Sequence, residues 1–105
     1  MSAVLRALGL CRRAGALVCG TPMVCAELPK GKTVIVLEAS DTSDGTHKKL
    51  TDKCGYYQVR HVRIAANGET LAAAVGKSGS LAAVAVTDKS LSRLVTKALE
   101  GDTSS

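Results

Sequence analysis

Hydrophobic residues recur along this chain with a helical period in some segments and form continuous runs in others. In residues 2–14 the apolar side chains lie three or four positions apart, which predicts a helix with Ser2 as its N-cap. Two later segments, TVIVL at residues 33–37 and LAAVAV at residues 81–86, contain only small, branched or β-branched residues. Such runs are typical of strands that are buried on both faces of a sheet.

The segments between these runs continue an alternation of helices and strands. We expect further strands at residues 16–19 and 59–65, and further helices at residues 21–28, 47–57 and 67–75 and after Asp88. The alternation predicts an α/β fold, a three-layer α/β/α sandwich with a central mixed sheet of about four strands. We assign residues 1–100 to a single domain and residues 101–105 to a disordered tail.

The composition narrows the range of partners. The 105 residues include 14 Lys and Arg and 9 Asp and Glu, which gives a net charge of +5, and the isoelectric point is about 9.2. This balance favours polyanionic partners. With two Tyr, no Phe and no Trp, an aromatic platform for stacking bases is not expected, so backbone amides, basic side chains and shape would have to recognise a nucleic acid. There is neither a membrane-length apolar run nor a signal-peptide pattern, and we expect a cytoplasmic protein without a membrane partner.

No set of residues in the sequence has the spacing of a catalytic or metal site. The four cysteines are Cys11, Cys19, Cys25 and Cys54, and no two of them have the close spacing of a structural zinc site, so we expect reduced, apolar filler. His47 and His61 stand alone in the sequence, and no activated nucleophile or carboxylate pair is recognisable. The sequence therefore predicts a protein that is not an enzyme and uses no cofactor and no metal.

Three collinear segments resemble a known family. They are LRALGLCRRAGALVCG at residues 5–20, THKKLTDKCGYYQV at residues 46–59 and LAAAVGKSGSLAAVAVTD at residues 71–88. Together they look like the small ribosomal proteins that recognise kink-turns in RNA, the large-subunit "seven-Ae" and "thirty-e" type, and especially their short bacterial relatives. The resemblance covers nearly the whole chain and implies the same α/β/α fold.

The resemblance also implies where RNA would bind, at the start of the second helix and in the loop after the fourth. The RNA-binding candidates are Gly20, Thr21, Pro22, Met23, Ser43, Gly76, Lys77, Ser78 and Gly79. A helix start offers unpaired amides, and a glycine-rich loop offers further amides beside the Lys77 cation. Thr21 as an N-cap followed by Pro22 also fits a helix start that binds no ligand, and Met23 also fits a packing residue.

The second helix departs from the family pattern. The typical kink-turn binder has Gly, a small residue, Asn and Glu here, with Lys three residues after the Glu; the corresponding positions are Gly20, Thr21, Pro22, Met23 and Ala26. Each lost polar base contact is worth about 1–3 kcal/mol by analogy with DNA readout. We therefore expect an RNA-binding protein with altered or weakened recognition, whose partner is a structured RNA (a kink-turn or ribosomal RNA) rather than DNA.

A protein-interaction module on the same fold, which has lost RNA binding and contacts ribosomal or other proteins, is the alternative. It is motivated by the apolar residues that replace the polar readers. The salt dependence of binding distinguishes the two, because phosphate contacts weaken steeply as the salt concentration rises.

Overall fold

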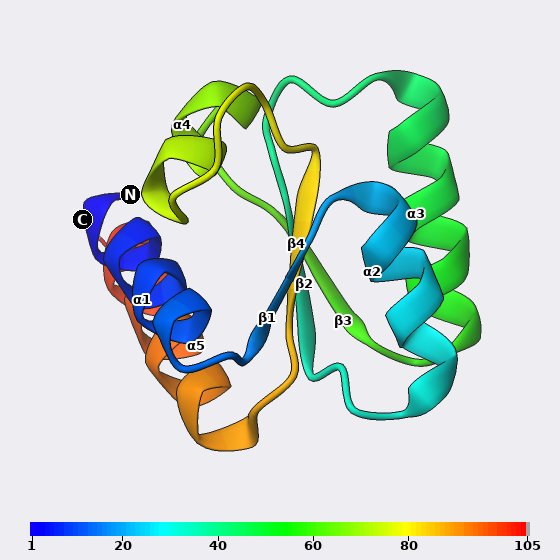
Figure 1. The fold of residues 1–105 in the computed structure, drawn as a ribbon, viewed down its shortest axis with the longest axis horizontal. Helices are drawn as coiled ribbons and strands as arrows, with labels where there is room; N and C mark the ends of the chain where they lie inside the picture. Colours follow the sequence, from blue (N-terminus) through cyan, green and yellow to red (C-terminus); the bar gives the residue numbers. More distant parts are fainter. Residues whose placement is uncertain (105) are drawn as a thin grey trace.

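A four-stranded mixed sheet runs through the middle of the molecule (Figure 1). Its strands lie in the order β1 (Leu17–Cys19), β4 (Ala83–Val86), β2 (Ile35–Glu38) and β3 (Arg60–Arg63). Strands β2 and β3 are parallel, whereas β4 is antiparallel to both of its neighbours, β1 and β2. The computed structural model describes residues 1–104, and the side chains of residues 1–101.

Helices cover both faces of this sheet. The helices are α1 (Ser2–Arg13), α2 (Thr21–Glu27), α3 (Asp44–Tyr56), α4 (Gly68–Ala74) and α5 (Lys89–Ser104), with a 3-10 turn, η1 (Leu28–Lys30), after α2. Helices α1, α4 and α5 pack on one face, and α2, η1 and α3 pack on the other (Figure 1). The predicted three-layer α/β/α sandwich with a mixed sheet of four strands is confirmed.

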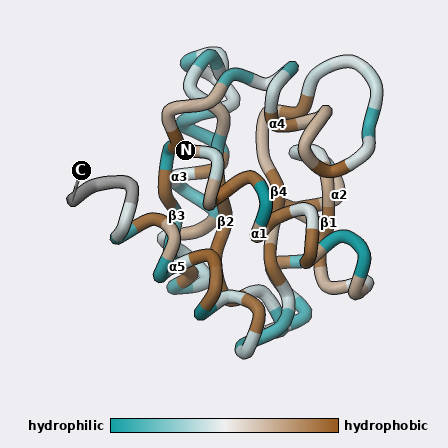
Figure 2. Tube along the Cα trace, turned by 90° about the vertical axis from the view of Figure 1, so that its left-hand side faces the viewer, coloured by the Kyte–Doolittle hydropathy of each residue, from teal (hydrophilic) through white to brown (hydrophobic). Residues whose placement is uncertain are grey.

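The two central strands supply both hydrophobic cores, because side chains alternate between the faces of a strand. The strand residues of the first core are Ile35, Leu37, Val84 and Val86, and those of the second are Val36, Ala83 and Ala85. All eight positions of β2 and β4 are buried, and seven of them lie in the two continuous apolar runs that predicted this burial. In Figure 2 the hydrophobic stretches gather around these central strands.

Several predicted boundaries differ from the structure. The strands are shorter than the apolar runs, and β2 extends one residue further than predicted, to the fully buried Glu38. The N-cap of α1 is Met1 rather than Ser2. Helix α5 includes residues 101–104, part of the predicted disordered tail, and residue 105 lies outside the described residues. Among the helices described, none is long and apolar enough to cross a membrane.

Candidate nucleic-acid interface

Three loops meet where β1 and β2 end and β4 begins, at the top of Figure 1. The pairing of Cys19 with Val84 and of Glu38 with Ala83 places the ends of β1 and β2 beside the start of β4. The segments that continue from these strand ends are therefore neighbours, although the sequence separates them widely. We call residues 20–23, 39–43 and 76–82 the rim.

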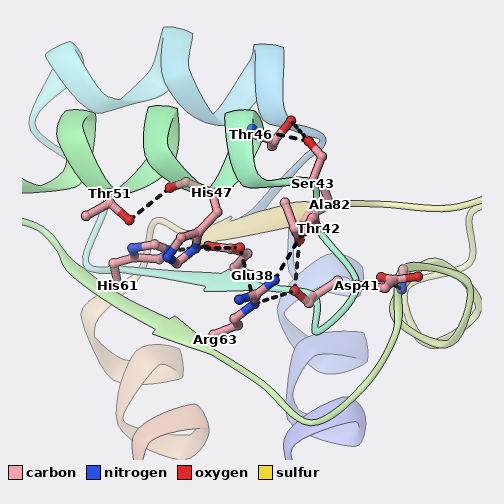
Figure 3. A network of polar contacts seen from close by, with 12 residues as sticks. Glu38, Asp41, Thr42, Ser43, Thr46, His47, Thr51, His61, Arg63 and Ala82 are labelled. Carbon is pink, nitrogen blue, oxygen red and sulfur yellow. Dashed lines mark hydrogen bonds and ion pairs between the residues drawn. The ribbon is translucent and has the colours of Figure 1, made fainter.

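Hydrogen bonds tie the segments of the rim together. The Gly20 N–H donates to the Ala83 carbonyl at 2.9 Å, and the Ala39 N–H donates to the Ala82 carbonyl at 2.8 Å. The Thr42 hydroxyl donates to the carbonyls of Ala39 at 2.8 Å and Ala82 at 3.5 Å (Figure 3). These hydrogen bonds join the three segments of the rim into one surface.

Helix α4 is anchored to the rim through Gly68. Its N–H donates to the Asp41 carboxylate at 2.8 Å, and its carbonyl accepts the Leu81 N–H at 3.0 Å. A side chain at Gly68 would collide with the Ser80 hydroxyl and approach the Leu81 carbonyl oxygen to 2.9 Å. The close approach of α4 to the loop before β4 therefore requires a glycine.

Helix α2 begins at the rim in a different way from the one predicted. Its N-cap is Gly20, with φ of +92°, so the interpretation of Thr21 as the cap is wrong. A glycine suits this position because residues with a Cβ rarely adopt positive φ. Pro22 lies in the first turn, where a missing N–H costs no helix hydrogen bond. Met23 is 61% exposed, which contradicts its interpretation as a packing residue.

The loop between α4 and β4 carries the cation Lys77 on the same surface. Gly76 and Gly79 both have positive φ, and Gly76, Lys77, Ser78 and Gly79 are all exposed. Lys77 and Met23 line one open hollow, which runs along the free edge of β1. The structure thus brings together the two segments that the sequence analysis singled out.

Arg12 and Arg13 adjoin this region, although neither was among the candidates singled out from the sequence. Arg12 lines the hollow together with Met23 and Lys77. Arg12 and Arg13 also line a second hollow that contains Gly76. Both arginines lie in the last turn of α1, where positive charge is favoured by the helix dipole. Two adjacent arginines at a helix end were the only signal in the sequence.

Positive charges near the hollow affect the pKa of the Cys19 thiol. Burial raises the pKa of Cys19, and the positive charges of Lys77 and Arg12 act in the opposite direction. Both cations are therefore close enough to act on the Cys19 thiolate, although burial outweighs their effect.

Ser43 has a structural task on the rim. Its hydroxyl accepts the Thr46 N–H at 3.3 Å and so caps α3, with Ser43 in the extended conformation typical of an N-cap. It does not line the hollow formed by Met23 and Lys77, as far as the described residues show. Ser43 therefore stands apart from the other candidates.

The comparison with known families agrees with this architecture. The family described as "Ribosomal protein L7Ae/L30e/S12e/Gadd45 family" matches residues 2–96. The chain belongs to this family. The match spans every strand of the sheet and all the residues that line the hollow, and it confirms the resemblance found in the sequence.

Two individual proteins are similar to the chain, one over most of its length and one over half. "RNA-binding protein YlxQ" of Bacillus subtilis is 38% identical over 82 residues, which cover 78% of this chain and 80% of the relative. A protein of the same name from Enterococcus faecium is 42% identical over 52 residues, half of each chain.

Solved structures of other proteins share this fold. A protein of unknown function from Bacillus halodurans superposes with a TM-score of 0.85 at 31% identity, covering 95% of this chain and 99% of its own. The 15.5kD RNA binding protein of Giardia lamblia superposes with a TM-score of 0.78 at 19% identity, covering 94% of this chain and 83% of its own.

Proposed function

We propose that this chain binds structured RNA at the rim and the adjoining hollow, through the start of α2, the loop after α4 and the C-terminal turn of α1. The observation that carries the proposal is the hollow lined by Arg12, Met23 and Lys77, two cations and one exposed apolar side chain from three separate segments. Two similar proteins bear the name "RNA-binding protein YlxQ", which supports RNA as the polyanion.

Phosphate contacts supply most of the affinity in this proposal. Lys77 and Arg12 neutralise phosphate charge and release counterions, which makes binding dependent on salt. The first turn of α2 adds the amides of Thr21 and Met23, because Pro22 has no N–H and the Val24 N–H already bonds to the Gly20 carbonyl. These groups position the RNA backbone without reading its sequence.

Recognition of bases is weaker than in the usual kink-turn binder. Pro22 and Met23 stand where that binder has an amide and a carboxylate; neither side chain can donate a hydrogen bond to a base edge, and the Met23 thioether is only a weak acceptor. The exposed Met23 instead offers a polarizable thioether to the flat face of a base. The protein therefore selects RNA mainly by shape and phosphate arrangement.

The test is binding of the purified protein to a kink-turn RNA and to a matched duplex without the kink, over a series of salt concentrations. Salt-sensitive binding with little preference for the kink-turn is the expected result. Strong preference for the kink-turn would refute the weakened base recognition while retaining RNA binding. No binding to either RNA at low salt would overturn the proposal and favour the protein-interaction alternative.

The matched variants are Lys77→Ala and Lys48→Ala. Lys48 is an exposed lysine on α3 that pairs with Asp52, outside the rim. Loss of affinity in Lys77→Ala alone places the RNA on the rim. Equal losses in both variants would mean that general charge, and not the hollow, attracts the RNA.

A further inference from the structure

A polar cluster separate from the rim lies between the sheet and α3. The carboxylate of Glu38 is fully buried, and two histidine rings converge on it (Figure 3). His47 Nδ1 lies 2.8 Å from each Glu38 oxygen, and His61 Nε2 lies 2.7 Å from Oε1. His47 and His61 follow Glu38 by nine and 23 residues in the sequence, and only the fold brings the three side chains together.

The pleat of the sheet explains why these side chains meet. In the parallel pairing of β2 and β3, Val36 lies opposite His61, and Glu38 lies opposite Arg63. Alternate residues point to the same face, so Glu38, His61 and Arg63 share the face that also carries Val36. Helix α3 covers this face and contributes His47 from its first half.

The cluster has the donor set of a metal site. One nitrogen from each of the two histidines and one carboxylate oxygen all lie within 4.8 Å of one another. Imidazole and carboxylate ligands suit Zn²⁺ and similar transition metals. We propose that Glu38, His47 and His61 form a binding site for Zn²⁺ or a chemically similar divalent metal.

The three ligand atoms lie close enough together to surround one metal ion once the side chains adjust. Neighbouring ligand atoms around a tetrahedral Zn²⁺ are roughly 3.3 Å apart, given bonds of about 2.0–2.1 Å. Each histidine nitrogen lies about half an ångström closer than this to the carboxylate, because these contacts have hydrogen-bond length, while all three ligand atoms lie within 4.8 Å of one another. The side chain of His47 is 41% exposed and can move outward by this amount. The same exposure leaves an open side, where water completes the coordination of the metal.

Arg63 completes the surroundings of the carboxylate. Its Nε lies 3.5 Å from Glu38 Oε2, and its Nη2 donates to the Thr42 carbonyl at 3.1 Å. Glu38 Oε1, which both histidines contact, is then the oxygen that binds the metal, and Oε2 stays with Arg63. Polar and charged groups behind a ligating carboxylate commonly orient it toward the metal.

The first experiment is a titration of the metal-free protein with Zn²⁺ in competition with a chromophoric chelator. We expect one Zn²⁺ per chain, and at least a tenfold weaker affinity for His47→Ala. His47→Ala removes a ligand that is partly exposed, so the variant should fold, which circular dichroism verifies. The matched control is Lys48→Ala, the neighbouring exposed residue on α3, and its affinity should equal that of the wild type.

Cobalt spectroscopy separates this site from the cysteines. Co²⁺ bound by histidine and carboxylate shows ligand-field bands without the intense thiolate charge-transfer band, whereas Co²⁺ on the free cysteines shows that band. Failure to bind Zn²⁺, an unchanged affinity in His47→Ala, or a thiolate band in the Co²⁺ spectrum would each overturn the proposal. One Zn²⁺ per chain, lost in His47→Ala and free of thiolate, supports it.

Discussion

Replacing Gly68 by alanine tests whether the rim is as tightly assembled as its hydrogen bonds indicate. Gly68 is buried in the first turn of α4, and the added Cβ would collide with the Ser80 hydroxyl and lie 2.9 Å from the Leu81 carbonyl oxygen. The Ser80 side chain can rotate away. The Leu81 carbonyl cannot, because its residue is held through the hydrogen bond between the Leu81 N–H and the Gly68 carbonyl.

Two opposing effects set the size of the change in stability. Replacing a helical glycine by alanine stabilises a protein by about 0.4–1 kcal/mol when the site is free of clashes. Overpacking costs about 1–3 kcal/mol. We therefore expect Gly68→Ala to lower the free energy of unfolding by about 1–2 kcal/mol.

Urea denaturation measures this difference. With a slope m of about 1.5 kcal/mol/M, the expected loss lowers the midpoint by about 1 M. Gly55→Ala in α3 is the matched control, since nothing lies within 4 Å of a Cβ added there, and it should raise the midpoint. The double variant Gly68→Ala with Ser80→Ala should recover only part of the loss, because the contact with the Leu81 carbonyl remains.

The decisive result is that the two glycine replacements shift the urea midpoint in opposite directions. If Gly68→Ala is as stable as the wild type, or shifts in the same direction as Gly55→Ala, α4 does not approach the loop as closely as the structure describes. The inference that Gly68 fixes the position of the loop carrying Lys77 would then be wrong.

Three further predictions concern charge, a buried thiol and a helix cap. Lys77→Ala should reduce the slope of log affinity for RNA against log salt concentration by about 0.7–0.9, as measured by a salt titration, whereas Lys48→Ala should leave it unchanged. Burial, followed by the nearby Cys25 and Glu38, raises the pKa of the Cys54 thiol from 9.0 to about 11. The folded state therefore keeps this proton longer than the unfolded state, so the associated stability is complete below pH 9 and is lost as the pH rises to about 11. Urea denaturation over this range should show a steeper loss for the wild type than for Cys54→Ala, and parallel profiles would contradict the assignment. Asn67→Ala should cost about 1 kcal/mol in the same assay, because the Asn67 side chain accepts the Thr70 N–H at 2.8 Å; no loss would mean that the cap does not stabilise α4.

Much of the fold was predictable because its signals are local. The alternation of helices and strands followed from the period of apolar residues, and both continuous apolar runs proved to be central strands. Strand ends were less predictable, because β2 begins and ends where its neighbours stop pairing with it. The extension of β2 to Glu38 shows this, since a glutamate after an apolar run is normally taken as the start of a loop.

The candidate interface was predictable only in part. The resemblance to the family identified Gly20–Met23 and Gly76–Gly79, and the structure joins these segments at Met23 and Lys77. It did not identify Arg12, which reaches the hollow from the end of α1. The signal of Thr21 as an N-cap was misleading, because Gly20 adopts a positive φ that the neighbouring residues do not reveal.

The sequence by itself determined the order of the elements, the two-sided burial of the central strands and the family to which the chain belongs, since each depends on residues that are near one another or on segments in a fixed order. The tertiary structure alone decided which distant residues share a site. The strand order β1-β4-β2-β3 places Lys77 and Arg12 along the edge strand β1. It also gathers Glu38, His47 and His61 on the face of the sheet that α3 covers. No local pattern encodes these neighbours, because they follow from strand pairing and helix packing over long separations in the chain.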